Sequence, residues 1–193
     1  MPDALGRLIA ALDQPAGPSS DFDLNPAETL PSGRLLRPAA VLVALWGQDL
    51  VLTKRASHLK HHPGQIALPG GKQEDGEGPE DAALREAEEE IGLSPQNVTV
   101  LGRLATHETV TGFQVTPILG QVRADFSPRS DPEEVEEVFT VPLAHLMDPG
   151  RYVIEGRHWR GQFRRYYAVP WGPYYVWGAT ARILRGLAER VGT

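Results

Sequence analysis

The middle of the chain holds acidic side chains whose spacing suits metal chemistry. Glu86, Glu89 and Glu90 are related by three and four positions, so a helix would place them on one surface. Like charges at that spacing cost a helix roughly 0.2–0.5 kcal/mol per pair, and a hard divalent cation such as Mg²⁺ or Mn²⁺ would reverse the repulsion. The alternative is a solvated acidic face in which Arg85 pairs with Glu89. The helix taken alone favours this alternative.

The segment that carries these carboxylates has clear helix boundaries. Pro79 suits the first helical position, where its missing N–H costs little. Gly92 suits the position just past the end, where a left-handed backbone is wanted. Leu84, Ala87 and Ile91 fall on one apolar face at helical spacing. The sequence therefore predicts a central helix that turns its apolar face inward and its carboxylates outward.

The other segments predict a mixed sheet between helices, which is an α/β fold with an α/β/α sandwich. Apolar and alternating runs predict strands at residues 39–46, 50–53, 65–68, 98–104, 115–122 and 139–142, and a late hairpin at 151–155 and 163–169. Helical spacing predicts further helices at residues 3–12, 143–147 and 180–190. Turn or loop composition marks residues 14–33, 54–64, 69–71 and the acidic segment 132–138.

Size and composition limit the class of protein. A length of 193 residues predicts one domain over residues 1–193, with residues 1–35 as a helix and loop packed on it or tethered to it. The absence of cysteine excludes thiolate metal sites and thiol nucleophiles. A net charge of −6 argues against a partner such as duplex nucleic acid. We expect a cytoplasmic protein without a membrane partner, because neither an apolar span nor a signal peptide is recognisable.

Residues 71–93 resemble the Nudix box. The matching residues are Gly71, Glu77, Arg85-Glu86-Ala87, Glu89-Glu90 and Gly92-Leu93. Seven fixed residue types agree, and a chance match is on the order of one in ten million per starting position. The resemblance implies a Nudix-type sandwich in which a loop–helix–loop presents carboxylates to Mg²⁺ or Mn²⁺ that bridge a substrate diphosphate.

The resemblance also implies roles for individual residues. Glu86 and Glu90 are expected to bind metal, and Glu89 to act as a further ligand or as the base. The carbonyl of Gly70 is a further candidate ligand, and Arg85 is expected to hold Glu77 and so fix the loop. The general base stays open, because many relatives take it from a loop far along the chain. The candidates there are Glu133, Glu134, Glu136 and Glu137, for each of which a solvated loop position is at least an equal expectation.

Two further stretches resemble the coenzyme A pyrophosphatase subgroup of this family. One comprises Leu52–Ala56, Lys60, Gly64 and Leu68–Gly71, and the other is Val176–Leu184. The subgroup usually has leucine, arginine and phenylalanine where this chain has Val51, Lys60 and Leu68. Lys60 keeps the charge but lacks the planar fork of arginine, which puts one phosphate contact in doubt.

A basic segment leads into the glycine turn of an otherwise acidic protein. Arg55 and Lys60 are the expected ligands of substrate phosphate, with Lys54 and Gly71 beside them, and the alternative is that the strand end simply reaches solvent. For the histidines of this segment, solvent exposure is the favoured interpretation: His58, His61 and His62. Aromatic residues crowd the last quarter of the chain, where the core is the more common location, and the alternative for some of them is to stack on adenine or to line a pantetheine groove: Trp159, Tyr166, Tyr167, Trp171, Tyr174, Tyr175 and Trp177.

Three functions remain to be compared. The first is cleavage of coenzyme A or its derivatives to 3′,5′-ADP and 4′-phosphopantetheine or its acyl form. The second is cleavage of another nucleoside diphosphate derivative, such as ADP-ribose or NADH. The third is a ligand sensor without catalysis, which the intact carboxylates argue against. Relatives in this family are often dimers, so a homodimer stays an open expectation.

Overall fold

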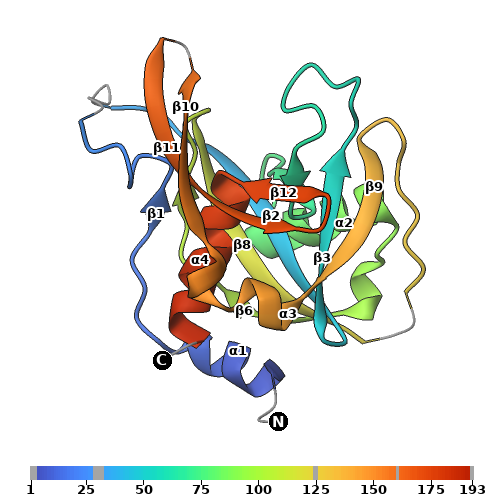
Figure 1. The fold of residues 1–193 in the computed structure, drawn as a ribbon. Coiled ribbons are helices and arrows are strands. Elements are labelled where there is room, and N and C mark those ends of the chain that lie inside the picture. Colours follow the sequence, from blue (N-terminus) through green and yellow to red (C-terminus); the bar gives the residue numbers. More distant parts are fainter. Residues whose placement is uncertain (1–3, 28–32, 124–125, 160, 192–193) are drawn as a thin grey trace.

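A mixed β-sheet forms the middle layer of the molecule (Figure 1). The structure is a computed structural model and describes residues 4–27, 33–123, 126–159 and 161–191. The strands of this sheet are β1 (Ser19–Ser20), β2 (Arg37–Trp46), β3 (Asp49–Arg55), β4 (Ile66–Ala67), β5 (Gly70–Lys72), β6 (Val98–Arg103), β7 (His107–Glu108), β8 (Phe113–Val122) and β9 (Val135–Pro142). Within the described residues their order is β1-β7-β8-β2-β3-β4, with β5 beside β2, β6 beside β8 and β9 beside β3.

The centre of the sheet is the parallel pair β2 and β8, which run side by side from Arg37 opposite Phe113 to Leu45 opposite Gln121. Two strands, β5 and β3, share the other edge of β2. β5 pairs with its first half and β3 with its last two residues. This arrangement leaves β5 directly beside the start of β2, close to the helix that follows it in the chain.

Helices cover both faces of the sheet. They are α1 (Ala4–Leu12), α2 (Pro79–Ile91), α3 (Leu143–Leu146) and α4 (Ala179–Val191), with 3₁₀ turns at Pro95–Asn97 and Pro149–Arg151. In Figure 1, α4 crosses in front of β2 and β8, and α2 lies behind the sheet. The α/β class and the sandwich with a mixed sheet, predicted from the sequence, are therefore confirmed.

Strand β2 shows how the sequence builds the two layers. Its side chains alternate, as they must on a pleated strand. Ala40, Leu42 and Ala44 are buried in a cluster with the apolar side of α2. Ala39, Val43 and Leu45 are buried in a second cluster on the opposite face with α1, α3 and α4. The continuous apolar run of this strand follows from burial on both sides.

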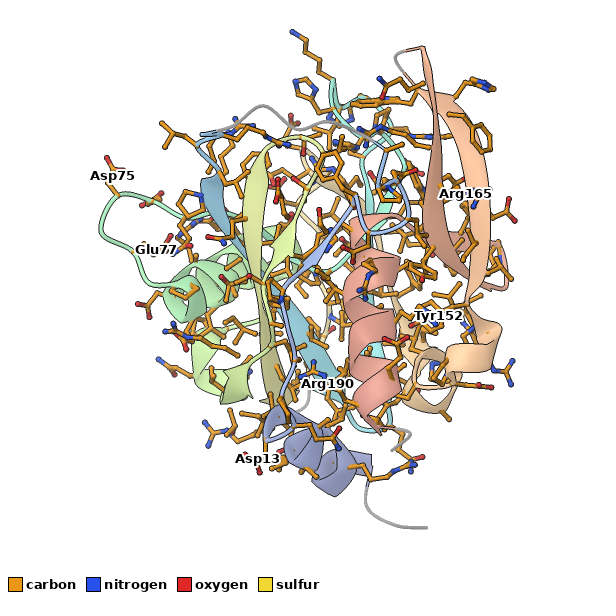
Figure 2. The ribbon with its side chains drawn as sticks, turned by 90° about the vertical axis from the view of Figure 1, so that its left-hand side faces the viewer. Asp13, Asp75, Glu77, Tyr152, Arg165 and Arg190 are labelled. Carbon is orange, nitrogen blue, oxygen red and sulfur yellow. The ribbon has the colours of Figure 1, made fainter. Side chains whose placement is uncertain are left out.

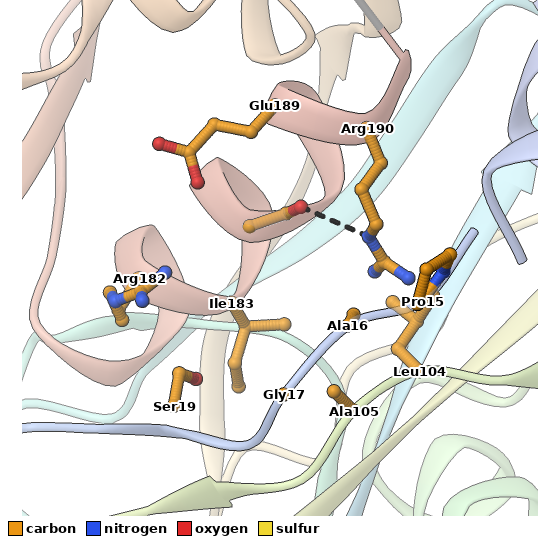
Figure 3. A pocket seen from close by; sticks show the side chains of 11 residues that line it. Pro15, Ala16, Gly17, Ser19, Leu104, Ala105, Arg182, Ile183, Glu189 and Arg190 are labelled. Carbon is orange, nitrogen blue, oxygen red and sulfur yellow. Dashed lines mark hydrogen bonds between the residues drawn. The ribbon is translucent and has the colours of Figure 1, made fainter. Parts of the chain in front are cut away.

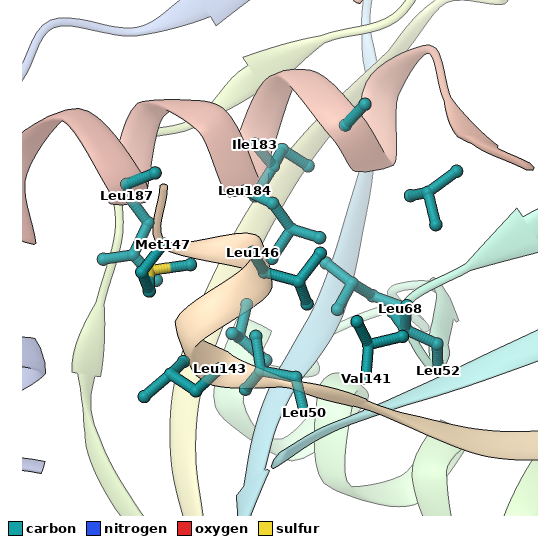
Figure 4. Packing of buried hydrophobic residues seen from close by; sticks show 14 of the residues in the cluster. Leu50, Leu52, Leu68, Val141, Leu143, Leu146, Met147, Ile183, Leu184 and Leu187 are labelled. Atoms are coloured by element: carbon teal, nitrogen blue, oxygen red, sulfur yellow. The ribbon is translucent and has the colours of Figure 1, made fainter. Parts of the chain in front are cut away.

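The second cluster is the larger core. Leu143, Leu146 and Met147 lie between the strands and α4, where Leu184 and Leu187 point toward them (Figure 4). α1 adds Leu8 and Ala11 from the other end of the chain. Deleting a fully buried leucine of this kind to alanine typically costs about 2–5 kcal/mol.

A smaller antiparallel sheet stands beside the main one. It consists of β10 (Val153–Trp159), β11 (Gln162–Trp171) and β12 (Tyr174–Trp177). Val169 and Val176 attach it to the main core. The two longer strands extend away from the core as a hairpin, in which Val153, Ile154 and Phe163 are exposed.

Several expectations from the sequence need correction. The glycines expected in a turn at 69–71 belong to strand β5, because they pair with Ala40 and Val41 of β2. The acidic segment 132–138, expected as a loop, ends in strand β9, which pairs with β3 from Val135 onward. The strands β1, β7 and β12 were not anticipated from the sequence.

Outside the two cores, a cleft of about 270 Å³ lies between residues 15–19 and α4 (Figure 3). Arg190 reaches into it and donates from Nε to the carbonyl of Gly186 at 3.1 Å and from a terminal nitrogen to the carbonyl of Ala11 at 3.2 Å. The arginine thereby ties α1 to α4. Among the described residues, no helix has the length and apolar character needed to cross a membrane.

Candidate metal centre and active site

The helix α2 begins and ends where its sequence predicts. Pro79 is its first residue, and Gly92 caps its end with φ of 71°. The N–H of Gly92 donates to the backbone carbonyl of Glu88 at 2.9 Å, and the N–H of Leu93 donates to the backbone carbonyl of Ala87 at 3.2 Å. Ala82, Ala83, Ala87 and Ile91 are buried on its inner side. This packing fixes the rotation of the helix about its axis and thereby the directions of its carboxylates.

Three carboxylates meet at one point beside α2. An oxygen of each of Glu86, Glu90 and Glu134 lies within 4.8 Å of the others. Two come from consecutive turns of the helix, and the third comes from the segment just before β9. Only oxygen ligands are present in this set, which is the chemistry that Mg²⁺ and Mn²⁺ prefer.

Glu90 is the most buried member of the cluster. It is 3% exposed, and its Oε2 accepts a hydrogen bond from the N–H of Gly70 at 3.0 Å. Burial raises the pKa of Glu90 to about 8, with a smaller upward contribution from the charge of Glu86. Burial also raises the pKa of Glu86. Carboxylates held together in this way are costly to ionise, and a bound cation would remove that cost.

Close neighbours leave no space for a side chain at either glycine of β5. A Cβ atom on Gly71 would lie 2.5 Å from Cδ and Oε1 of Glu86. A Cβ atom on Gly70 would lie 2.3 Å from the carbonyl oxygen of Ala40 and 2.6 Å from Cα of Val41. Gly71 therefore clears space for the Glu86 side chain, whereas Gly70 clears space for the neighbouring strand.

Arg85 organises the loop before the helix. Its Nε donates to Glu77 at 2.8 Å, and its terminal nitrogens donate to the carbonyl of Lys72 at 3.0 Å and to Glu86 and Glu89 at 3.0 Å each. Figure 2 shows Glu77 in the loop that precedes the helix and Asp75 at the tip of that loop. The pKa of Glu77 is lowered, chiefly by its hydrogen bond from Arg85. The structure thus brings together the pair expected from the sequence.

Glu89 stands apart from the three-carboxylate cluster. Its side chain is 59% exposed and is paired with Arg85. This is the pairing that the alternative interpretation anticipated for one carboxylate of the helix. The roles of Glu89 expected from the sequence, as ligand or as base, stay predictions.

The four acidic candidates near β9 have different surroundings. Glu134 joins the cluster. Glu136 accepts hydrogen bonds from Lys54, at 2.7 Å, and from Ser57. Glu137 accepts a hydrogen bond from the hydroxyl of Tyr174, and the N–H of Glu133 donates to Asp131. Sequence reasoning named all four residues without choosing among them, and only the fold places Glu134 opposite α2.

The predicted phosphate ligands also differ in their surroundings. Lys54 forms an ion pair with Glu136. The hydrogen bond from Lys54 is the largest of the contributions that lower the pKa of Glu136 to about 2. Arg55 lies at the end of β3, and its Nε is buried with no hydrogen-bond partner among the described residues. Burial raises the pKa of Glu90, and the charge of Arg55 is a smaller contribution that opposes this rise. Partial burial of the ring lowers the pKa of His62, and the charge of Arg55 lowers it further. Arg55 therefore lies between the acidic cluster and the basic loop.

The basic loop forms one wall of a pocket of about 690 Å³. Lys60, His61, His62 and Gly64 line it from this side, and Trp177 and Gly178 line it from another. The hairpin β10–β11 supplies further lining residues, among them Arg157, Arg164, Arg165 and Tyr166. The histidines were expected in solvent, and all three are exposed, although His61 and His62 also face this pocket.

None of the seven late aromatics is fully buried, so the core location favoured from the sequence applies only to those that pack against the edge of the core. Tyr175 is exposed, and the other six are half-buried. Tyr167, Trp171 and Tyr174 pack against the edge of the main core. Trp159, Tyr166 and Trp177 line the pocket instead.

Comparisons with known proteins show the family of this chain. The family model described as NUDIX domain matches residues 36–163. “Uncharacterized Nudix hydrolase NudL” of Escherichia coli (strain K12) is 42% identical over 160 residues, which cover 81% of this chain and 83% of that protein. The protein of the same name from Cronobacter sakazakii (strain ATCC BAA-894) is 43% identical with the same coverage. The crystal structure of the MutT protein from Methanosarcina mazei Go1 aligns with a TM-score of 0.54 at 17% identity, covering 85% of this chain and 96% of that one.

The chain belongs to the Nudix family. It is a Nudix hydrolase of the pyrophosphohydrolase kind, which acts on pyrophosphate bonds in small-molecule substrates. Such enzymes generally use divalent metal ions, and the residues present fit one: Glu86, Glu90 and Glu134 offer oxygen ligands at one point, and the buried Glu90 is costly to ionise alone.

Proposed function

We propose that this Nudix hydrolase cleaves the diphosphate of coenzyme A or its derivatives, giving 3′,5′-ADP and 4′-phosphopantetheine or its acyl form. The observation that carries the proposal is the convergence of two stretches that are far apart in the sequence. Lys60 and Gly64 of the first stretch and Trp177 and Gly178 of the second line the same pocket. Both stretches resemble the coenzyme A subgroup, and a shared pocket is what a common ligand would require.

Arg55 supports the proposal from the side of the diphosphate. Its buried Nε has no acceptor among the described residues, and an unpaired buried donor is costly. A phosphate oxygen would supply the missing acceptor, because a guanidinium binds phosphate in a charge-assisted contact. Lys60 offers a second, exposed cation farther along the same loop.

The residues of the acidic cluster then have separable tasks. Glu86, Glu90 and Glu134 would hold Mg²⁺ or Mn²⁺, which when bound polarises the phosphoryl oxygens and makes water a stronger nucleophile. Arg85 holds Glu86 and Glu77 and thereby fixes the loop that faces the substrate. The carbonyl of Gly70 and the carboxylate of Glu89 complete the proposed set. We keep Glu89 as a candidate base, because its exposed carboxylate lies one residue from Glu90.

A competition assay tests the substrate assignment. The purified protein, with Mg²⁺ or Mn²⁺, is offered coenzyme A, ADP-ribose, NADH and a nucleoside triphosphate at equal concentrations, and the products are separated by chromatography. We expect coenzyme A to be consumed fastest with release of 3′,5′-ADP. Faster cleavage of ADP-ribose or NADH would favour the second candidate function and would remove coenzyme A as the main substrate.

A further inference from the structure

Strand β9 contains one residue more than its partner β3 beside the acidic cluster. Lys54 is opposite Glu137, whereas the next residue, Arg55, is opposite Val135, so the ladder leaves Glu136 without an opposite residue. Such a β-bulge is over-represented next to active sites, where it redirects a side chain. The extra residue lies two positions after the glutamate that this segment contributes to the acidic cluster.

The carboxylate of Glu136 is bound at both of its oxygens. One accepts a hydrogen bond from Nζ of Lys54 at 2.7 Å. The other accepts from the N–H of Ser57 at 3.2 Å and from the hydroxyl of Ser57. All three residues are at least partly exposed, and an ion pair in that setting adds little to folding stability. The contacts of this group, which we call the clamp, are therefore better explained by what they hold in place.

The clamp encloses Arg55, the residue proposed to bind the diphosphate. Two of its members, Lys54 and Ser57, stand on either side of Arg55 in the chain. The basic loop, residues 56–64, closes on the same residue, because the N–H of Gly64 donates to the carbonyl of Arg55 at 3.1 Å. The clamp therefore ties the residues on both sides of Arg55 to β9.

The segment leading into β9 holds Glu134 in the acidic cluster. The carbonyl of Glu134 accepts from the N–H of Ala56 at 2.9 Å, and the N–H of Glu134 donates to the carbonyl of Asp131 at 3.1 Å. The N–H of Asp131 donates in turn to the carbonyl of Glu90 at 2.9 Å. Glu134 therefore lies between the basic loop on one side and helix α2 on the other, so its place in the cluster depends on where the loop begins.

We propose that Glu136 is a positioning residue, which through the clamp fixes where Arg55 lies relative to Glu134. The clamp in this role rests on the proposed function and changes one part of it. Lys54, expected from the sequence to lie beside substrate phosphate, is instead committed to Glu136. Glu136 also leaves the set of candidate bases, because both of its oxygens are occupied within the clamp. Metal affinity and use of a diphosphate substrate then depend on the same three side chains.

Binding of Mn²⁺ to the substrate-free protein tests the clamp, because the two roles of Lys54 predict effects of opposite sign. A lysine that only binds phosphate repels a nearby cation, so its loss in Lys54→Met would leave Mn²⁺ affinity unchanged or raise it. We expect Lys54→Met and Glu136→Ala instead to lower Mn²⁺ affinity by about tenfold, the lower end of the cost of losing a group that supports a metal ligand. Lys54→Arg keeps the ion pair and should bind Mn²⁺ nearly as tightly as the parent. Electron paramagnetic resonance of free Mn²⁺ measures the affinities.

Arg103→Met is the matched control for Lys54→Met. Arg103 forms an ion pair with Glu80 in the first turn of α2, which is a comparable surface contact outside the clamp. This variant should keep the parental Mn²⁺ affinity. All of the variants should melt close to the parental temperature, because surface ion pairs add little to stability. A lower affinity at an unchanged melting temperature would separate positioning from loss of the fold.

Turnover of coenzyme A by the same samples separates failure of the clamp from failure of the proposed function. If the parental protein cleaves coenzyme A but Lys54→Met and Glu136→Ala both keep the parental Mn²⁺ affinity, the clamp is wrong and the function stands. A higher KM for coenzyme A in Lys54→Met at unchanged Mn²⁺ affinity would also overturn the clamp and return Lys54 to the phosphate ligands. If the parental protein cleaves no coenzyme A but both variants lose Mn²⁺ affinity, the function is wrong and the clamp stands.

Discussion

At the scale of single residues, Glu86 and Glu90 are in positions that oppose folding unless a cation is present. Their oxygens lie within 4.8 Å of Glu134, and burial raises the pKa of both helix residues. We expect Glu86→Gln and Glu90→Gln to lower kcat by about 100-fold or more, because metal assistance contributes several kcal/mol to the transition state. The metal-free variants should melt at or above the parental temperature, and the rise should be largest for Glu90→Gln near pH 8. Turnover assays and thermal melts on the same samples measure both effects.

Glu88→Gln is the control for these variants. Glu88 lies on the same helix and is exposed, outside the cluster. It should keep parental turnover and stability. Parental rates in both Glu86→Gln and Glu90→Gln would refute the assignment of the metal centre.

The pKa of Glu90 also predicts how stability depends on pH. Because the folded pKa of about 8 is above the ordinary value of 4.5, the folded state binds this proton more tightly than the unfolded state. In the metal-free protein, this contribution is fully present below pH 4.5 and is lost as the pH rises to about 8. Glu90→Gln should remove this dependence and exceed the parental stability at pH 8, by on the order of 2–4 kcal/mol. Urea unfolding between pH 5 and 8 measures it, and identical slopes in parent and variant would contradict it.

At the scale of elements, strand β5 can lie against β2 and beside Glu86 because two of its residues, Gly70 and Gly71, have no side chain. Gly71→Ala places a methyl group 2.5 Å from the Glu86 carboxyl, so we expect metal affinity to fall about tenfold while the fold persists. Gly70→Ala places its methyl group 2.3 Å from backbone and should lower the melting temperature as well. Mn²⁺ titration and thermal melts distinguish the two. Gly17→Ala, with open space around it, is the control.

The elements differ in how far the sequence predicted them. α2 was predicted to the residue, because Pro79 and Gly92 act locally at its ends. β2 and β8 were predicted because their apolar runs reflect burial on both faces. β5 was not predicted as a strand, because Gly70 and Gly71 have no pattern of their own and pair only where β2 meets them. β1 and β7 are two residues each, which is too short for a periodicity.

At the scale of the whole molecule, the N-terminal segment is fastened to the sheet by a buried histidine. His107 is fully buried, with Nδ1 2.9 Å from Oγ of Ser19 and Nε2 3.0 Å from Asp21. His107→Leu removes the hydrogen bonds of Ser19 and Asp21 to the imidazole ring, so we expect a loss of roughly 2 kcal/mol in the free energy of unfolding. Urea unfolding measures the loss, and His58→Leu at an exposed position is the control. Equal stability of the two variants would show that the contact does not fasten the segment.

The site was predictable from the sequence only where its residues are near neighbours. The Nudix box gave Glu86, Glu90 and the Arg85–Glu77 pair, because all of them lie on or just before one helix. Glu134 reaches the cluster only through the pairing of β3 with β9, which no local pattern encodes. The same applies to Glu136, whose place in the bulge depends on the register of the same two strands. Long-range strand pairing is therefore the information that the sequence motifs lacked.

The central claim is that Glu86, Glu90 and Glu134 form a metal centre at which coenzyme A is cleaved. The most direct test strips the protein with a chelator and restores Mg²⁺ or Mn²⁺ stepwise, while chromatography follows the products from coenzyme A in the parent and in Glu134→Gln. We predict no product from the stripped protein, 3′,5′-ADP on restoration of metal, and a markedly higher metal requirement in Glu134→Gln. Continued cleavage by the stripped protein, or no cleavage of coenzyme A at any metal concentration, would contradict the claim.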